Sequence, residues 1–214
     1  MDYSESKLPP TYDVAENELP YQIKLALWQT AFGLQKVDGL SPSEYMVELA
    51  YENIEGKKGY DAIYREISDY HREAHVDANT VEADIVSLRI AELLAEDHFL
   101  LSPSTLLGIH RHLFTDVFPE EIPVGKFRTV NITKNEPVLN GETVAVFGIQ
   151  YLRKLGLHID YSLFSEHAAY FRNALVLYHY HGEKQSKEFL KHFFENLLLG
   201  KKNVLSDEAL RMKE

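Results

Sequence analysis

The sequence contains no cysteine, and it has few basic residues for its length. Its 214 residues include 22 Lys and Arg against 33 Asp and Glu, which gives a formal net charge of −11. The lack of cysteine excludes disulfides, thiolate metal sites and cysteine nucleophiles. The deficit of basic residues argues against nucleic acid as a partner, because binding to the phosphate backbone needs a face rich in Lys and Arg.

Long apolar runs are also lacking. Runs such as residues 144–149 and 174–178 are far shorter than the roughly 20 residues that span a bilayer. The first residues, MDYSESK, are polar and acidic, unlike a secretory signal peptide. We therefore expect a cytoplasmic protein without a membrane partner. Its 45% hydrophobic and 12% aromatic residues are enough for a folded core.

Apolar residues recur mostly at helical spacing, which predicts a mostly α fold. Ser41 and Pro42 are expected to cap a helix that Gly56 ends, and Ser102 and Pro103 a later one. The other expected helices cover residues 21–34, 60–71, 80–97, 143–155, 165–180 and 186–199. One small β-hairpin is expected between them, because residues 127–132 alternate and turn signals follow at 134–137 and 140–141.

Searches for common catalytic and binding motifs find none. The sequence has no Gly-rich dinucleotide or phosphate loop and no Gly-x-Ser-x-Gly elbow. His71 and His75 are spaced i,i+4 and could share a helix face, but the nearby Glu73 is misplaced for a zinc helix. We interpret both histidines as solvated surface residues and expect no metal site.

Two consecutive segments resemble the Fic (Fido) family. Residues 109–114, IHRHLF, are similar to the "IHxxLF" helix of that family, and residues 125–132, GKFRTVNI, to its "GxxRxxNI" segment. The resemblance implies a Fic-like helical bundle in which the hairpin is a flap that holds a target segment by β-strand addition. The flap and target-docking residues would be Gly125, Arg128, Asn131 and Lys134.

The resemblance extends over about residues 80–200. Residues 82–90 are similar to the helix that opens the Fic core, and residues 145–153 and 170–176 to the segments after its active-site motif. It implies that Tyr170 and Asn173 lie near the place of the nucleotide base.

The N-terminal region resembles the small antitoxin module of some Fic proteins, on residues 33–35, 38–43 and 54–57. In such modules a Ser/Thr-x-x-x-Glu-Gly/Asn motif inhibits the enzyme, because its Glu pairs with an Arg that would hold the γ-phosphate. Asp38 and Gly39 align with the Glu-Gly of that motif, while Leu34 stands at the Ser/Thr position. The alternative interpretation is that Asp38 and Gly39 only form a turn between helices.

The catalytic motif of the family is absent. Fic proteins transfer AMP from ATP to a protein hydroxyl with the motif His-x-Phe-x-Asp/Glu-Gly-Asn-x-Arg-x-x-Arg. The His is the general base, the acidic residue holds Mg²⁺, and the turn and the arginines bind phosphate. In this sequence residues 140–142 run directly into residues 143–149, as if the central helices and the catalytic loop were excised together. The segment HFFEN at 192–196 lacks Gly-Asn-x-Arg, so we assign no catalytic residue.

These observations predict three regions: an antitoxin-like module over residues 1–75, an incomplete Fic core over 76–200, and a tail over 201–214. We expect a degenerate Fic protein without adenylyltransferase activity or cofactor, with a protein-binding or regulatory role. The loss of central helices should expose apolar surface, which self-association or a protein partner would cover. Three alternatives stay open. They are an adenylyltransferase with an unrecognised active site that uses ATP and Mg²⁺, a deletion product with no evolved role, and an unrelated helical binding module.

Overall fold

The computed structural model describes residues 19–119, 121–126, 140–179 and 185–210, and these residues are mostly helical, without a strand among them. The mostly α prediction is confirmed, while the expected hairpin falls in residues 127–139, outside the described residues. The elements are α1 (Tyr21–Gln35), η1 (Lys36–Asp38), α2 (Glu44–Ile54), α3 (Tyr60–Ala74), α4 (Ala78–Ala95), α5 (Pro103–Phe114), α6 (Gly141–Lys154), α7 (Tyr161–Glu166), α8 (Ala168–His179), α9 (Glu188–Leu199) and η2 (Asp207–Leu210).

Local sequence signals explain most helix ends. Ser102 caps α5 by accepting a hydrogen bond from the Thr105 N–H, and Pro103 takes the first helical position, as predicted. Two local predictions are wrong. Ser43, not Ser41, caps α2, because its hydroxyl accepts from the Met46 N–H at 3.0 Å. The helix expected over residues 165–180 is divided into α7 and α8, since the backbone leaves helical geometry at His167.

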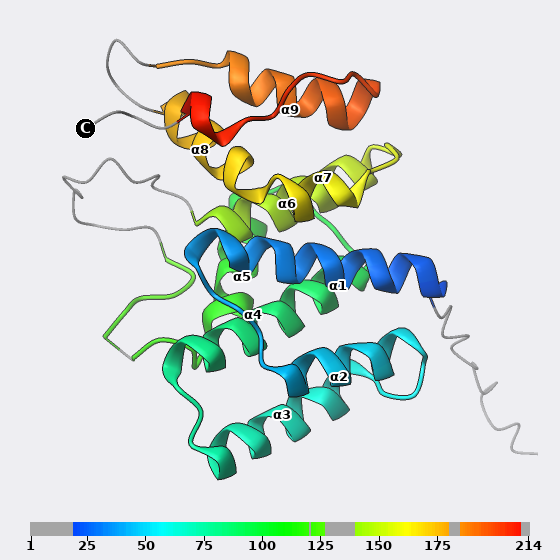
Figure 1. Ribbon diagram of the computed structural model, residues 1–214, viewed down its shortest axis with the longest axis vertical. Helices are drawn as coiled ribbons and strands as arrows, with labels where there is room; N and C mark the ends of the chain where they lie inside the picture. Colours follow the sequence, from blue (N-terminus) through cyan, green and yellow to red (C-terminus); the bar gives the residue numbers. More distant parts are fainter. Residues whose placement is uncertain (1–18, 120, 127–139, 180–184, 211–214) are drawn as a thin grey trace, which may run out of the picture.

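Helix α1 lies in the middle of the protein. It packs against α2, α4, α6, α7 and α8. In Figure 1 it lies between the pair α2 and α3, at the bottom of the view, and the pair α8 and α9, at the top. Leu27, Trp28, Ala31 and Leu34 of this helix are all at most 3% exposed. Burial of several large apolar side chains, each worth about 1.5–3 kcal/mol, makes α1 the main packing element of the core.

Helix α1 approaches α7 closely at Gly33. A Cβ atom added there would stand 2.5 Å from the Cα and 2.6 Å from the carbonyl oxygen of Ser165, in α7. These are backbone atoms, which cannot move aside without moving the helix. Nearby, the Thr30 hydroxyl lies 3.3 Å from the Tyr161 carbonyl oxygen of the same short helix. Glycine at position 33 therefore sets the spacing of α1 and α7.

A buried carboxylate joins α2, α3 and α4. Asp84 is fully buried and accepts hydrogen bonds from the Ser43 N–H and the Ser43 hydroxyl, each at 2.7 Å. Its Oδ2 also lies 2.8 Å from Nε2 of His71, whose side chain is only 9% exposed. The surface interpretation of His71 is thus wrong, because Asp84 needs buried hydrogen-bond donors. His75 remains exposed and ends α3 in the left-handed conformation.

The hydrophobic core continues across residue 75, where we place the boundary of the antitoxin-like module. The buried side chains of the core come from residues before and after position 75, from Leu27 in α1 to Leu210 in η2. The reason is that α1 packs more closely on α4 and α7 than on its neighbours α2 and α3. The N-terminal helices and the rest of the described chain therefore share one core.

Gly33→Ala is expected to lower the free energy of unfolding by about 2 kcal/mol or more, because overpacking forces two backbones apart. The matched control is Gly148→Ala, also inside a helix, where an added Cβ meets no atom within 4 Å. That change should stabilise the protein by about 0.5–1 kcal/mol through helix propensity. Urea unfolding followed by circular dichroism measures both, and equal effects of the two changes would contradict this account of α1.

Candidate functional site

The residue aligned with the inhibitory Glu lies beside an arginine. Asp38 ends η1, and Gly39 follows in the left-handed conformation with φ 73°. Helix α8 packs against η1, and Nη1 of Arg172 lies 3.5 Å from Oδ1 of Asp38. Both side chains are partly exposed, so solvent weakens this ion pair. The structure thus joins the first turn after α1 to the segment at 170–176.

A buried glutamate lies next to this ion pair. Glu142 stands in the first turn of α6 and is only 5% exposed. Burial, followed by the nearby Asp38 carboxylate, raises the pKa of Glu142 to about 8. Within the described residues, its Oε2 atom has no hydrogen-bond partner. Glu142 is therefore a carboxyl group that holds its proton near neutral pH.

A third carboxyl group belongs to the same cluster. The pKa of Glu82, in α4, is raised by its partial burial and by the charge of Asp38. We call Asp38, Glu82, Glu142 and Arg172 the acidic cluster. Its members come from η1, α4, α6 and α8, and α1 brings these elements together because it contacts all four. The cluster thus has three carboxyl groups and one guanidinium group, which pairs with Asp38.

The N-terminus of α6 explains why Glu142 is buried. Asn140 caps this helix, and its Oδ1 accepts hydrogen bonds from the N–H and the hydroxyl of Thr143 at 3.0 and 3.1 Å. Helix α6 therefore begins at Gly141, two residues before the predicted start, and its first turn holds Glu142 against the core. The Asn140-x-x-Thr143 spacing is a capping pattern that the sequence could have revealed.

The other residues that the resemblance selects lie in different surroundings. Tyr170 is 1% exposed and its hydroxyl donates to the Phe189 carbonyl at 3.1 Å, so its ring belongs to the core. Asn173 is half-buried and follows Arg172 in α8. Arg128, Asn131 and Lys134 of the expected flap lie outside the described residues.

Gly125, the first of the flap residues, packs against α5. Its N–H donates to Nδ1 of His110 at 2.9 Å, which connects the two segments that first suggest the Fic resemblance. The φ of Gly125 is 64°, and an added Cβ would approach Cβ of Arg111 to 2.6 Å. Both the conformation and the close contact require glycine at this position.

The acidic cluster has limited chemical capacity. A protonated Glu142 can donate a proton, and Arg172 can bind an anion only if it leaves Asp38. In the described parts of the chain, no group of three or more His, Asp or Glu side chains could hold a metal ion. From this cluster the sequence pattern indicates only Asp38, together with the adjacent Gly39. Glu82, Glu142 and Arg172 were missed because long-range packing, not local pattern, brings them together.

Comparison with known proteins adds no relative. No family model, curated protein or solved structure matches the chain. Among the helices of the described residues, none combines the length and the apolar character needed to cross a membrane.

The raised pKa of Glu142 predicts a pH-dependent stability. The unfolded chain releases this proton near pH 4.5, whereas the folded chain keeps it to about pH 8. The contribution of Glu142 is therefore fully present below about pH 4.5 and is lost as the pH rises toward 8. Glu142→Gln, a neutral isostere, should remove this loss and stabilise the protein by about 2 kcal/mol at pH 8 and above.

Urea unfolding at about pH 5 and about pH 9 measures this effect. The variant Glu48→Gln is the matched control, because Glu48 is exposed on α2 and should leave the pH profile unchanged. If the free energy of unfolding of wild type exceeded that of Glu142→Gln by an amount that grows with pH, the raised pKa of Glu142 would be contradicted.

Proposed function

We propose that the chain is a degenerate Fic protein that does not transfer AMP and acts by binding another protein. The observation that carries the proposal is the charge of the acidic cluster. In Fic proteins with an antitoxin module, the arginine paired to the inhibitory acid is the one that holds the γ-phosphate. Here the corresponding acid is Asp38, which pairs with Arg172 and has the carboxyl groups of Glu82 and Glu142 nearby.

The electrostatics of this cluster oppose nucleotide binding. A phosphate chain carries several negative charges, and its binding sites in proteins use unpaired cations and backbone N–H groups. Arg172 is paired with Asp38, and ionisation of Glu142 or Glu82 would add repulsion at short range. A nucleoside triphosphate at this place would have to displace Asp38 and overcome these charges.

The start of α6 supports the same proposal. The family binds diphosphate at a Gly-Asn-x-Arg turn that leads into a helix N-terminus. In this chain the Thr143 N–H, at the start of α6, donates to the side chain of Asn140. Glu142 places a carboxyl group in the first turn of the same helix. Both features replace an anion-binding helix end by a self-capped one. The histidine that serves as general base in the family motif is also missing from the sequence, and base catalysis alone is worth about 10²- to 10⁴-fold in rate.

Exposed apolar side chains give positions at which the protein-binding part of the proposal can be tested. Leu199 at the end of α9 is 67% exposed, and Val204 after it is 84% exposed. Leu155, at the end of α6, is 57% exposed. Scattered apolar residues occur on most proteins, so these positions are sites to test by substitution in a binding assay.

The test compares wild type with Asp38→Asn and with Asp38→Asn combined with Arg172→Ala. In a Fic enzyme inhibited by Asp38, the first change would release Arg172 and raise AMP transfer, and the second would remove that gain. We expect no transfer of labelled AMP in any of the three proteins, with Mg²⁺ and a lysate of candidate targets. Calorimetry should likewise detect no ATP binding.

AMP transfer by Asp38→Asn that Arg172→Ala abolishes would refute the proposal and favour the adenylyltransferase alternative. Specific ATP binding by wild type would refute it as well. Retention of the helical circular dichroism spectrum in each variant is the control for folding.

A further inference from the structure

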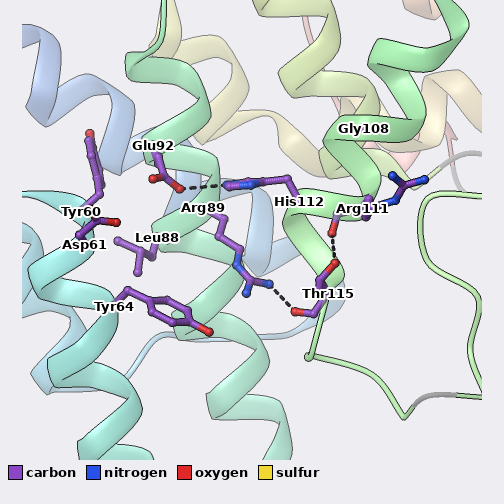
Figure 2. A pocket seen from close by; sticks show the side chains of 10 residues that line it. All are labelled: Tyr60, Asp61, Tyr64, Leu88, Arg89, Glu92, Gly108, Arg111, His112 and Thr115. Carbon is purple, nitrogen blue, oxygen red and sulfur yellow. Dashed lines mark hydrogen bonds and ion pairs between the residues drawn. The ribbon is translucent and has the colours of Figure 1, made fainter.

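A groove lies between α3, α4 and α5, apart from the acidic cluster (Figure 2). Its volume is about 530 Å³, within the range of sites that bind small molecules or single side chains of a partner. Asp61 and Tyr64 of α3 line one side, and Gly108 and His112 of α5 the other. The side chain of Arg89, from α4, lies between them in Figure 2.

The positive charges around the groove are engaged elsewhere. Arg89 is 8% exposed, and its Nη1 donates to the carbonyls of Leu113 and Thr115 at 3.1 and 2.6 Å. It therefore neutralises the C-terminal end of α5, where carbonyl groups lack helical partners. The guanidinium group of Arg111 points away from the groove in Figure 2.

The two acidic residues that line the groove, Asp61 and Glu92, differ in their partners. Asp61 is exposed, and no ion pair involves it within the described ranges. Oε2 of Glu92 lies 2.9 Å from Nε2 of His112, and this histidine adds a positive charge only when it is protonated. The groove thus offers one carboxylate without an ion pair, Asp61, beside the Glu92–His112 pair, in a protein of net charge −11.

An aromatic ring adds a second recognition element. Tyr64 is 39% exposed, and Arg89 already lies 5.6 Å from the centre of its ring. The contact shows that this ring accepts a guanidinium group as a neighbour. The combination of two carboxylates and a partly exposed tyrosine ring is suited to a cation that carries its charge on an apolar stem.

We propose that this groove binds an arginine or lysine side chain of a partner protein. The proposal rests on the protein-binding role proposed above and defines the chemistry of the partner. The ammonium or guanidinium group would contact Asp61 and Glu92, and its methylene stem would lie along Tyr64. The negative net charge of the chain would attract a basic partner at long range and would make association salt-dependent.

The groove can be closed without disturbing the core. Gly108 lines it, and a Cβ added at this residue meets no atom within 4 Å. Gly108→Trp should therefore fill the groove and leave the fold intact. Gly148→Trp is the matched control, because Gly148 is also a helical glycine with free space at its Cβ but does not line the groove.

The probes are two blocked tripeptides, acetyl-Gly-Arg-Gly-amide and acetyl-Gly-Glu-Gly-amide, each titrated into labelled protein and followed by NMR. The arginine peptide should cause saturable shifts at backbone amides of α3 and α5, and the glutamate peptide should not. Gly108→Trp and Asp61→Asn should each weaken the arginine peptide by about tenfold. Gly148→Trp should leave its affinity unchanged.

Equal shifts with both peptides, saturable shifts away from α3 and α5, or equal loss in both tryptophan variants would overturn the proposal. If Gly108→Trp fails to fold, the surface change Asp61→Asn decides alone. This titration is independent of the AMP-transfer assay. AMP transfer in that assay would refute the proposed function even if the groove binds arginine. A failed titration would refute the groove proposal and leave the result of the AMP-transfer assay unchanged.

Discussion

The spacing of α1 and α7 at Gly33 is the constraint on which the rest of the structure depends. The missing side chain at Gly33 lets the backbone of Ser165 approach α1 closely, and the same helix buries Trp28 and Leu34 against its other neighbours. Because α1 is fixed in this way, η1, which follows it directly, packs against α8. The ion pair of Asp38 with Arg172 is therefore a consequence of helix packing, since its own energy is small in a partly exposed setting.

Two buried carboxyl groups show how differently the fold treats the same chemistry. Asp84 is fully buried but accepts three hydrogen bonds, from Ser43 and His71, so its burial ties three helices together. Glu142 is nearly as buried, yet one of its oxygens has no hydrogen-bond partner in the described structure, and a neighbouring acid raises its pKa to about 8. The hydrogen bonds of the first group offset the cost of its burial, whereas ionisation of the second destabilises the fold. An unfavourable carboxyl group at a self-capped helix start is the kind of local conflict that marks a functional or altered site.

The sequence alone was sufficient for features with short-range causes. Helical periodicity predicts the mostly α fold, and the Ser102-Pro103 pair marks the start of α5 correctly because a cap acts within three residues. The errors arise where tertiary contacts decide between local options. Ser43 caps α2 in preference to Ser41 while its hydroxyl also donates to Asp84, forty-one residues away. His71 looks like a surface residue until its partner on α4 is known. The acidic cluster could be predicted only through Asp38, because its other members come from elements whose approach α1 determines.

The two proposed sites follow from one electrostatic property, an excess of carboxylates that α1 and α4 hold in different environments. Around η1 the excess surrounds a single arginine, so an incoming phosphate would meet repulsion that grows as Glu142 ionises. In the groove the side chains of Asp61 and Glu92 line an open cavity that a cation can enter. Arg89 makes this possible, because it turns its own charge to the carbonyls at the end of α5 instead of to Glu92. Under the two proposals, a chain whose sequence motifs resemble a nucleotide-binding family would have exchanged affinity for a polyanion for affinity for a basic partner.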